Sequence, residues 1–191
     1  VDPANGKFGA GLQFDGVTGQ HMRVEASDDM NIGSNFVTLS AWVKLNELPS
    51  QISGPFAGVY DSTTDDYIFY VDKANKELRF KATSSSGVST AGPNHPGVHE
   101  SLLNTNEWVH VMGVYDGDRG RVTMYYNGQF ADISTHTGGA TMLGGPVRGN
   151  QVAGMGAEAK VNFPEFTNDR QFNGAIADVA VWNRPLGLAE A

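Results

Sequence analysis

The chain is 191 residues long, contains no cysteine and carries a formal net charge of −8. Without cysteine, disulfide bridges and thiolate metal sites are excluded, and the acidic surplus argues against broad binding to nucleic acid or anionic lipid. No apolar run is long enough for membrane insertion. The length predicts a single domain over residues 1–191, large enough to bury a core.

The N-terminal half alternates short apolar runs with turn residues, as β-strands joined by tight turns do. The clearest run goes from Val37 to Leu45, where every second residue is apolar and Thr38, Ser40, Trp42 and Lys44 lie between. The strands predicted in this half lie within residues 9–16, 22–24 (a return strand), 37–45, 56–60, 67–71 and 78–82.

Residues 106–128 predict the central hairpin of the domain. A strand over residues 108–115 has two largely apolar faces, which places it between two layers. A second strand over residues 121–126 has one wetter side, and Asn127-Gly128 marks a further tight turn. One face of the first strand carries Trp108, His110, Met112 and Val114, and the other carries Val109, Val111 and Tyr115.

The remaining segments are less regular. Residues 84–99 and 162–173 read as polar loops, and Leu186 to Glu190 as a single helical turn. Strand-like segments are predicted over residues 130–133, 152–156 and 175–182. In the last of these, Val179 and Val181 are expected on one face and Ile176, Asp178 and Trp182 on the other. Strands at this spacing predict an all-β sandwich or barrel, without excluding an immunoglobulin-like sandwich.

Six motifs occur in an order that is informative in itself. They are Gly11–Gly16, Leu39–Lys44, Glu107–Val111, Val114–Gly117, Tyr126–Gly128 and Phe172–Arg184. Through them the chain resembles laminin-G-like domains of the concanavalin A-like, pentraxin-related branch over nearly its whole length. The resemblance implies a jelly-roll sandwich of two antiparallel sheets, often a calcium ion, and binding rather than catalysis. Bacterial members are commonly modules of secreted glycan-degrading enzymes or adhesins, so a secreted or cell-surface location within a longer protein is expected.

An acidic loop over residues 61–66 is the first candidate metal site. Several carboxylates on one flexible loop supply the oxygen ligands that calcium prefers, although a solvated loop with Asx turns has the same composition. The resemblance places a calcium ligand at Asp65 or Asp66, a second near Asn150 and a later acidic one near Glu158. The dense acidic cluster of pentraxins is missing there, which argues against a paired-calcium site.

A structural ion held by Asp15 and Asp178, near the two ends of the chain, is the second metal hypothesis. Asp178 has apolar neighbours on its predicted face, so a buried carboxylate there would need a partner. Hydrogen bonds from backbone amides would satisfy it equally well.

The candidate ligand contacts are aromatic residues that could stack on a sugar ring and polar residues that could bind its hydroxyls. They are Tyr60, Asp61, Tyr67, His95, His99, Arg148, Phe166, Asp169 and Arg170. Because Pro96-Gly97 separates His95 from His99, these two cannot form a helical metal pair. His110 and the three tryptophans belong to strand motifs and are expected to serve packing.

The motifs of the common hydrolases are missing from the sequence. There is no paired-carboxylate run of the glycosidase type, no Gly-x-Ser-x-Gly and no phosphate-binding loop. Together with this absence, the family resemblance and the acidic loop imply a non-catalytic, calcium-assisted, lectin-like carbohydrate-binding module of a secreted bacterial protein. A protein-interaction or adhesion module is the alternative, followed by a glycoside hydrolase or lyase.

Overall fold

β-Strands form most of the regular structure, which a computed structural model describes over residues 2–17, 19–25, 32, 34–62, 67–83, 95–135, 153–159 and 166–191. The described helices are short 3-10 turns: η2 (Pro49–Gln51), η3 (Glu100–Leu102) and η4 (Leu188–Glu190). Among the described residues, no helix has the length and apolar character needed to cross a membrane.

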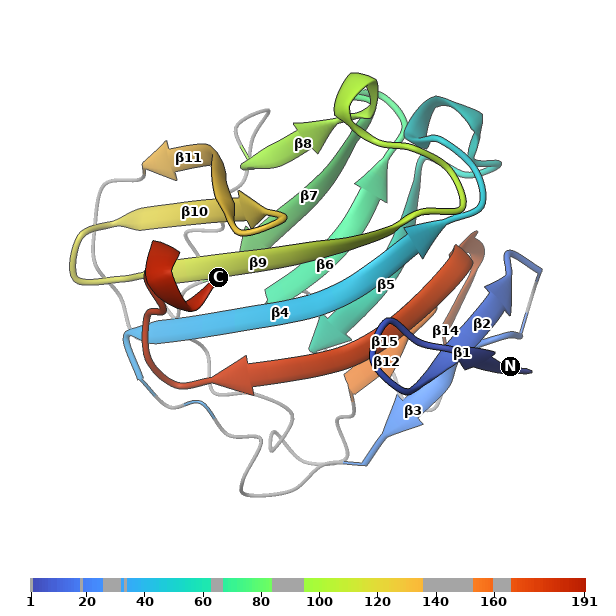
Figure 1. Cartoon of the computed structure of the whole chain (residues 1–191), viewed down its shortest axis with the longest axis horizontal. Coiled ribbons are helices and arrows are strands. Elements are labelled where there is room, and N and C mark those ends of the chain that lie inside the picture. The colour runs from blue at the N-terminus through green and yellow to red at the C-terminus, as the bar shows by residue number, and fades with distance from the viewer. Residues whose placement is uncertain are drawn as a thin grey trace.

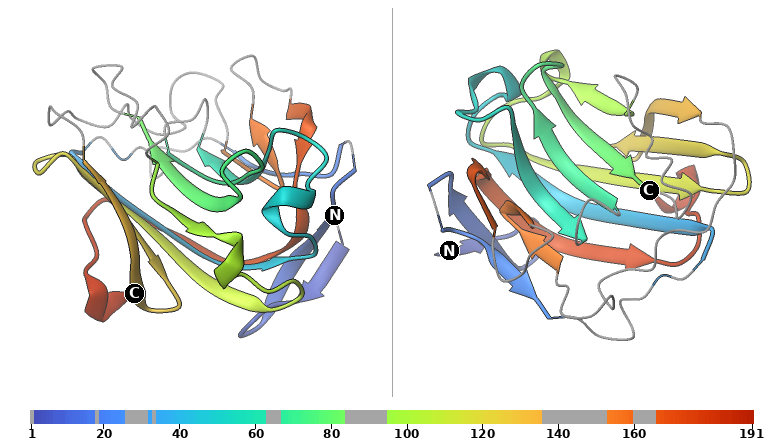
Figure 2. Two further views of the ribbon diagram at one scale, coloured as in Figure 1. Left: turned by 90° about the horizontal axis from the view of Figure 1, so that it is seen from above. Right: turned by 180° about the vertical axis from the view of Figure 1, so that it is seen from behind.

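Two antiparallel sheets face each other, so the predicted jelly-roll sandwich is confirmed (Figures 1 and 2). The seven-stranded sheet has the order β1 (Asp2–Asn5), β2 (Ala10–Asp15), β15 (Asn173–Trp182), β4 (Phe36–Leu45), β9 (Trp108–Asp116), β10 (Arg121–Tyr126) and β11 (Gln129–Thr135). The six-stranded sheet has the order β3 (Met22–Val24), β12 (Ala153–Met155), β5 (Phe56–Ser62), β6 (Tyr67–Asp72), β7 (Glu77–Ala82) and β8 (Gly97–His99). A separate pair joins β13 (Ala157–Ala159) to β14 (Phe166–Gln171).

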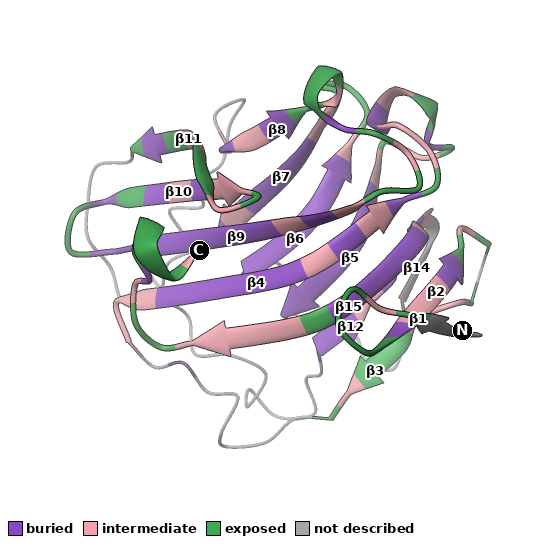
Figure 3. Ribbon diagram, viewed as in Figure 1, coloured by how far each residue is buried: buried purple, intermediate pink, exposed green. Residues whose placement is uncertain are grey.

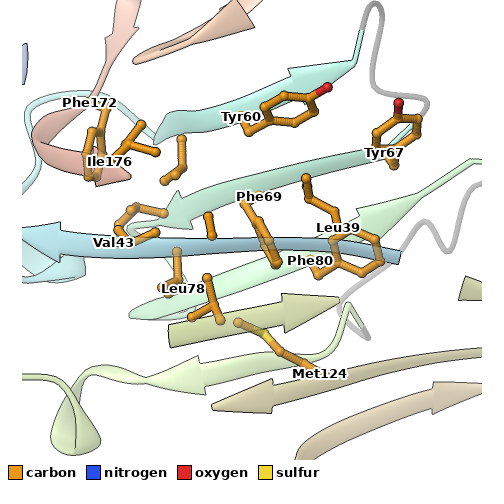
Figure 4. Close-up of a cluster of buried hydrophobic side chains, with 14 of the residues drawn as sticks. Leu39, Val43, Tyr60, Tyr67, Phe69, Leu78, Phe80, Met124, Phe172 and Ile176 are labelled. Atoms are coloured by element: carbon orange, nitrogen blue, oxygen red, sulfur yellow. The ribbon is translucent and has the colours of Figure 1, made fainter. Parts of the chain in front are cut away.

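The core lies between the sheets because alternate residues of each strand point inward. Leu39 and Val43 of β4 meet Phe69 of β6 and Phe80 of β7, all fully buried (Figure 4). Each such side chain contributes about 1.5–3 kcal/mol relative to an exposed position. Figure 3 shows the buried residues running along the central strands of both sheets. β9 and β10 form the predicted central hairpin, and their burial confirms the two largely apolar faces of β9 and the wetter side of β10.

A glycine is required at Gly113, where β9 packs against β7 of the opposite sheet. It lies in β9, and a Cβ placed there would stand 2.2 Å from Cγ of Phe80. The Phe80 ring therefore fills the space that a side chain at this position would need.

The last strand differs from its prediction. Pairing with β4 shifts register between Ala177 and Ala180, and Asp178 at the shift has a left-handed φ of 49°. The bulge reverses the faces on its two sides, so Ile176, Val179 and Val181 all pack toward the core. The prediction that put Ile176 opposite the two valines is wrong for this reason.

Other segments differ in pairing or length. The return strand β3 does not pair with β2 but crosses to the six-stranded sheet beside β12. Two of the predicted polar loops contain the strands β8 and β14. Both β3 and β8 are three residues long, too short for alternation to identify a sheet.

Candidate functional site

A polar hollow of about 330 Å³ lies where the edge strand of one sheet meets the edge strand of the other. Its lining residues come from β7, from the segment before β8 and from β11. Figure 1 shows β8 and β11 next to each other at the edges of the two sheets. It is lined by Glu77, Arg79, His95, Asp132, Ile133, Ser134 and Thr135.

Arg79 organises this hollow. It alternates with the core residues Leu78 and Phe80, so its side chain points to the outer face of the six-stranded sheet, yet it is only 3% exposed. Its Nη1 lies 3.2 Å from Oδ2 of Asp72 and its Nε lies 3.2 Å from Oε2 of Glu77. Nε and Nη2 also donate to the backbone carbonyl of His95, at 3.1 and 2.6 Å. One guanidinium thus ties two carboxylates and the segment before β8 together.

His95 is held from a second side by Tyr70 of β6. The Tyr70 hydroxyl and the His95 Nδ1 form a hydrogen bond, and the two rings meet edge to face with centroids 5.9 Å apart. With its carbonyl on Arg79 and its ring on Tyr70, the imidazole has a fixed orientation at the wall of the polar hollow.

The pKa values of the two carboxylates beside Arg79 are shifted in opposite directions. For Asp72, burial alone favours a higher pKa, but hydrogen bonds from Asn75 and the interaction with Arg79 outweigh it, so the pKa lies below its usual value. For Glu77, burial raises the pKa above its usual value; Arg79 opposes the rise and Asp132 adds to it. Glu77 and Asp132 therefore interact as like charges within one hollow.

Asp132 reaches the polar hollow from β11. Its Oδ2 accepts a hydrogen bond from the backbone N–H of Gly97 at 3.2 Å, and its Oδ1 accepts one from its neighbour Ile133 at 2.8 Å. Because the Gly97 bond crosses from β8 to β11, it holds the two sheet edges together at the hollow.

The raised pKa of Glu77 gives a prediction for stability. A carboxyl with a higher pKa in the folded than in the unfolded state takes stability away as pH rises from about 4.5 through the folded value. Glu77→Gln removes this loss, so the melting temperature of the variant minus that of the wild type should increase with pH across this window. Melting curves at a series of pH values check this. A difference that stays constant or falls as pH rises contradicts the assignment.

Of the predicted ligand contacts whose side chains the structure describes, only His95 lines the polar hollow. Tyr60 and Tyr67 were expected to be exposed for stacking on a sugar, which is wrong: both are buried in the core, with ring centroids 6.1 Å apart (Figure 4). Burial, followed by the proximity of Tyr67, raises the pKa of Tyr60 well above its usual value. The bulge between Gly58 and Tyr60 turns Tyr60 inward.

The other predicted ligand contacts whose side chains the structure describes do not line the polar hollow. Asp61 is fully buried in β5 and is not available to a ligand at the surface. His99 is exposed and its ring accepts a hydrogen bond from the Ser101 N–H, which caps η3. The Arg170 guanidinium lies 3.8 Å from the centre of the Phe56 ring.

The shared ion site of Asp15 and Asp178 is not formed. Asp15 pairs with Asn173 of β15, and Asp178 lies five positions further on, about 16 Å along the strand. Asp15 instead accepts hydrogen bonds from Val17 N and Gln20 Nε2 within its own turn. Asp178 is exposed at the bulge, so its carboxylate does not need a buried partner.

Several predicted positions fall outside the described residues, namely Asp65, Asp66, Arg148 and Asn150. Glu158 lies in β13 and Phe166 and Asp169 lie in β14, but their side chains are not among those described. Within the described part, no three His, Asp or Glu side chains gather closely enough to hold a metal ion.

The sequence analysis missed most of the polar hollow. Glu77 and Arg79 lie on β7, whereas Asp132 lies on β11 of the other sheet, so no local motif connects all three. A charged residue placed between Leu78 and Phe80 is the one local signal, since it marks the outer face of a strand without showing that this face is covered.

The comparisons with known proteins agree with this architecture. The family model of the concanavalin A-like lectin/glucanases superfamily matches residues 16–191, and the chain belongs to that superfamily. Among curated protein sequences, none shows significant similarity.

Solved structures share the fold at low identity. A heptameric SAP-like pentraxin from Limulus polyphemus matches with a TM-score of 0.64 and 16% identity, covering 92% of this chain and 76% of its own. Domain 4 of an extracellular arabinanase from Geobacillus stearothermophilus, solved with arabinotriose, matches with a TM-score of 0.56 and 17% identity. The match covers 98% of this chain and 77% of the arabinanase chain. The ligand binding domain of botulinum neurotoxin serotype D, solved with N-acetylneuraminic acid, matches with a TM-score of 0.64 and 13% identity. The match covers 99% of this chain and 42% of the neurotoxin chain. The chain spans less than half the length of several further matched structures.

Proposed function

We propose that the chain is a non-catalytic, lectin-like carbohydrate-binding module, and that the polar hollow holds the hydroxyl groups of a neutral sugar. The observation that carries the proposal is the convergence of fixed donors and acceptors in one hollow. Sugar hydroxyls both donate and accept hydrogen bonds. Glu77 and Asp132 offer acceptors, whereas Ser134 and Thr135 offer hydroxyls that do both.

The charge of the polar hollow selects among sugars. Glu77 and Asp132 together carry two negative charges against the one positive charge of Arg79. The balance of these groups is negative, which disfavours acidic sugars through like-charge repulsion. The two solved structures with bound saccharides support a sugar as the ligand class for this fold, and the local charge supports a neutral one.

Binding is favoured over hydrolysis by the state of the two carboxylates. Asp132 accepts backbone hydrogen bonds on both oxygens, and Glu77 is paired with Arg79. A glycosidase needs one carboxyl to donate a proton and another to activate water or attack the sugar. Carboxylates already held by the protein's own donors suit fixed recognition better.

The alternative of a protein-interaction module finds less support. Phe130 and Ile133 share β11, and the other large exposed apolar side chains among the described residues are spread over separate segments, namely Phe8, Val17, Met22, Leu102 and Leu188. A docking site for an apolar protein surface usually presents one contiguous patch.

Calcium and location are further parts of the proposal. Calcium assistance rests on the sequence of the acidic loop 61–66 and on the family resemblance. We place the module in a secreted or cell-surface protein, as a part of a longer chain.

A glycan array probed with and without a chelator such as EGTA tests the proposal. The expected result is binding to a neutral oligosaccharide that weakens in EGTA. Equal binding under both conditions removes calcium from the proposal. Absence of sugar binding under either condition contradicts the function itself.

A further inference from the structure

A second hollow, here called the aromatic groove, lies on the outer face of the seven-stranded sheet and has a volume of about 620 Å³. Its floor is formed by Trp42 of β4 and by Trp108 and His110 of β9. Its walls are the β1–β2 loop with Lys7, the β10–β11 turn with Asn127, and η4 with Glu190. Figure 1 shows these three segments around β4 and β9. The volume falls within the roughly 300–1,000 Å³ typical of small-molecule sites.

The indole rings of the floor are partly exposed rather than packed away. Trp42 and Trp108 alternate with the core residues Val43 and Val109, so both rings point out of the sandwich. The Trp42 and His110 rings lie with centroids 5.3 Å apart and form one aromatic surface. Aromatic side chains at such a surface offer a large apolar area with a polar edge, which suits the alternating C–H and O–H groups of a sugar ring.

Two ammonium groups stand over these rings. Lys7 Nζ lies 5.2 Å from the centre of the Trp42 ring, and Lys44 Nζ lies 5.3 Å from that of Trp108. Across the part of the chain that the structure describes, neither lysine forms a salt bridge. Each ammonium group instead makes a cation–π contact with an indole ring.

Glu190 is the acidic side chain that lines the groove, and it is already paired. Glu190 Oε1 lies 2.7 Å from Nη2 of Arg184, and its Oε2 accepts a hydrogen bond from Gly187 N. Of the two charged side chains that line the aromatic groove, Lys7 is therefore the one without an ion pair among the described residues.

The groove is also rigid. Asn127 and Gly128 take left-handed φ values of 48° and 73°, as a tight hairpin turn requires. Asn127 Oδ1 accepts from His110 N, and Asn127 N donates to His110 O, both at 2.9 Å. Burial lowers the pKa of His110, so its imidazole is neutral at pH 7 and offers one donor and one acceptor.

We propose that the aromatic groove is a second binding site, and that its ligand is an acidic saccharide whose ring stacks on Trp42 and Trp108 while its carboxylate meets Lys7. The groove shares no lining residue with the polar hollow, so this site is independent of the neutral-sugar site. With both sites occupied, one module would bind two classes of glycan.

Titration calorimetry with two matched trisaccharides tests the second site. The trimer of galacturonic acid and the trimer of galactose differ at C6, where a carboxylate replaces a hydroxymethyl group. Lys7→Gln is the test variant. Lys76→Gln is the control, because it removes the same charge from an exposed turn that does not line the aromatic groove. Melting curves of both variants establish that they fold.

The acidic trimer is expected to bind the wild type at least about tenfold more tightly than the neutral trimer, and Lys7→Gln to lose at least about tenfold in affinity. Lys76→Gln and Glu77→Gln are expected to keep the affinity of the wild type, which separates this site from the polar hollow. The proposal is overturned if the acidic trimer does not bind, if both trimers bind equally, or if Lys7→Gln binds as the wild type does.

Discussion

Arg79→Met is expected to lower the free energy of unfolding by about 3 kcal/mol. The substitution removes the buried guanidinium that pairs with both Asp72 and Glu77. Asp72 and Glu77 are 15% and 25% exposed, so water relieves part of the cost, and the value falls at the low end of the usual range for broken buried pairs. Methionine keeps much of the volume of arginine, which confines the effect to lost charge and hydrogen bonds. Urea unfolding measures it.

Arg119→Met is the matched control for this experiment. Arg119 pairs with Asp116 at 2.7 Å, a shorter distance than either pair of Arg79, but its side chain is 66% exposed. Exposed pairs contribute about 0–1 kcal/mol. Equal losses in the two variants would show that the burial of Arg79 does not govern its contribution.

Gly113→Ala is the second substitution with a large expected effect, a loss of about 3 kcal/mol in the free energy of unfolding. The new Cβ would meet three ring carbons of Phe80 at 2.2–2.5 Å. The ring cannot swing away easily, because Phe80 is fully buried and packs on Phe69 with centroids 5.1 Å apart. The two sheets must therefore separate locally, or Phe80 must leave its rotamer.

Gly9→Ala serves as the comparison, since a Cβ at Gly9 has no atom within 4 Å. This variant should be neutral or slightly stabilised through a less flexible unfolded chain. A second variant, Gly113→Ala combined with Phe80→Leu, should regain part of the loss if the clash is its cause. If the clash is not the cause, the stability loss of the double variant will equal or exceed the sum of the losses of the two single variants, and this result would contradict the explanation.

The alternation of apolar residues predicted the long strands well because their burial is regular. In β4, β6, β7, β9 and β10, each inward residue meets the opposite sheet, and period two identifies the faces. Short strands such as β3 and β8 carry too few residues for a period. The bulge at Asp178 arises from a local left-handed φ, which an aspartate tolerates. The presence of an aspartate in a strand does not by itself predict such a φ.

The candidate site was harder to predict because its residues come from distant parts of the chain. His95 was selected as a polar residue near turns, and the structure places it in the polar hollow. Tyr60 was selected as aromatic next to an acidic loop, but a bulge in β5 turns it into the core. The burial of Arg79 depends on what covers the outer face of its sheet, a property that strand periodicity does not contain.

The most direct test of the central claim is the affinity of Glu77→Gln for the neutral oligosaccharide selected by the array, measured by titration calorimetry beside Glu25→Gln. Glu25 undergoes the same chemical change after β3, at the other edge of the six-stranded sheet. If the polar hollow binds the sugar hydroxyls, Glu77→Gln loses about tenfold in affinity, since one hydrogen bond to a charged group is weakened, and Glu25→Gln keeps the wild-type value. Equal affinities of the two variants would contradict the assignment of the polar hollow as the sugar site.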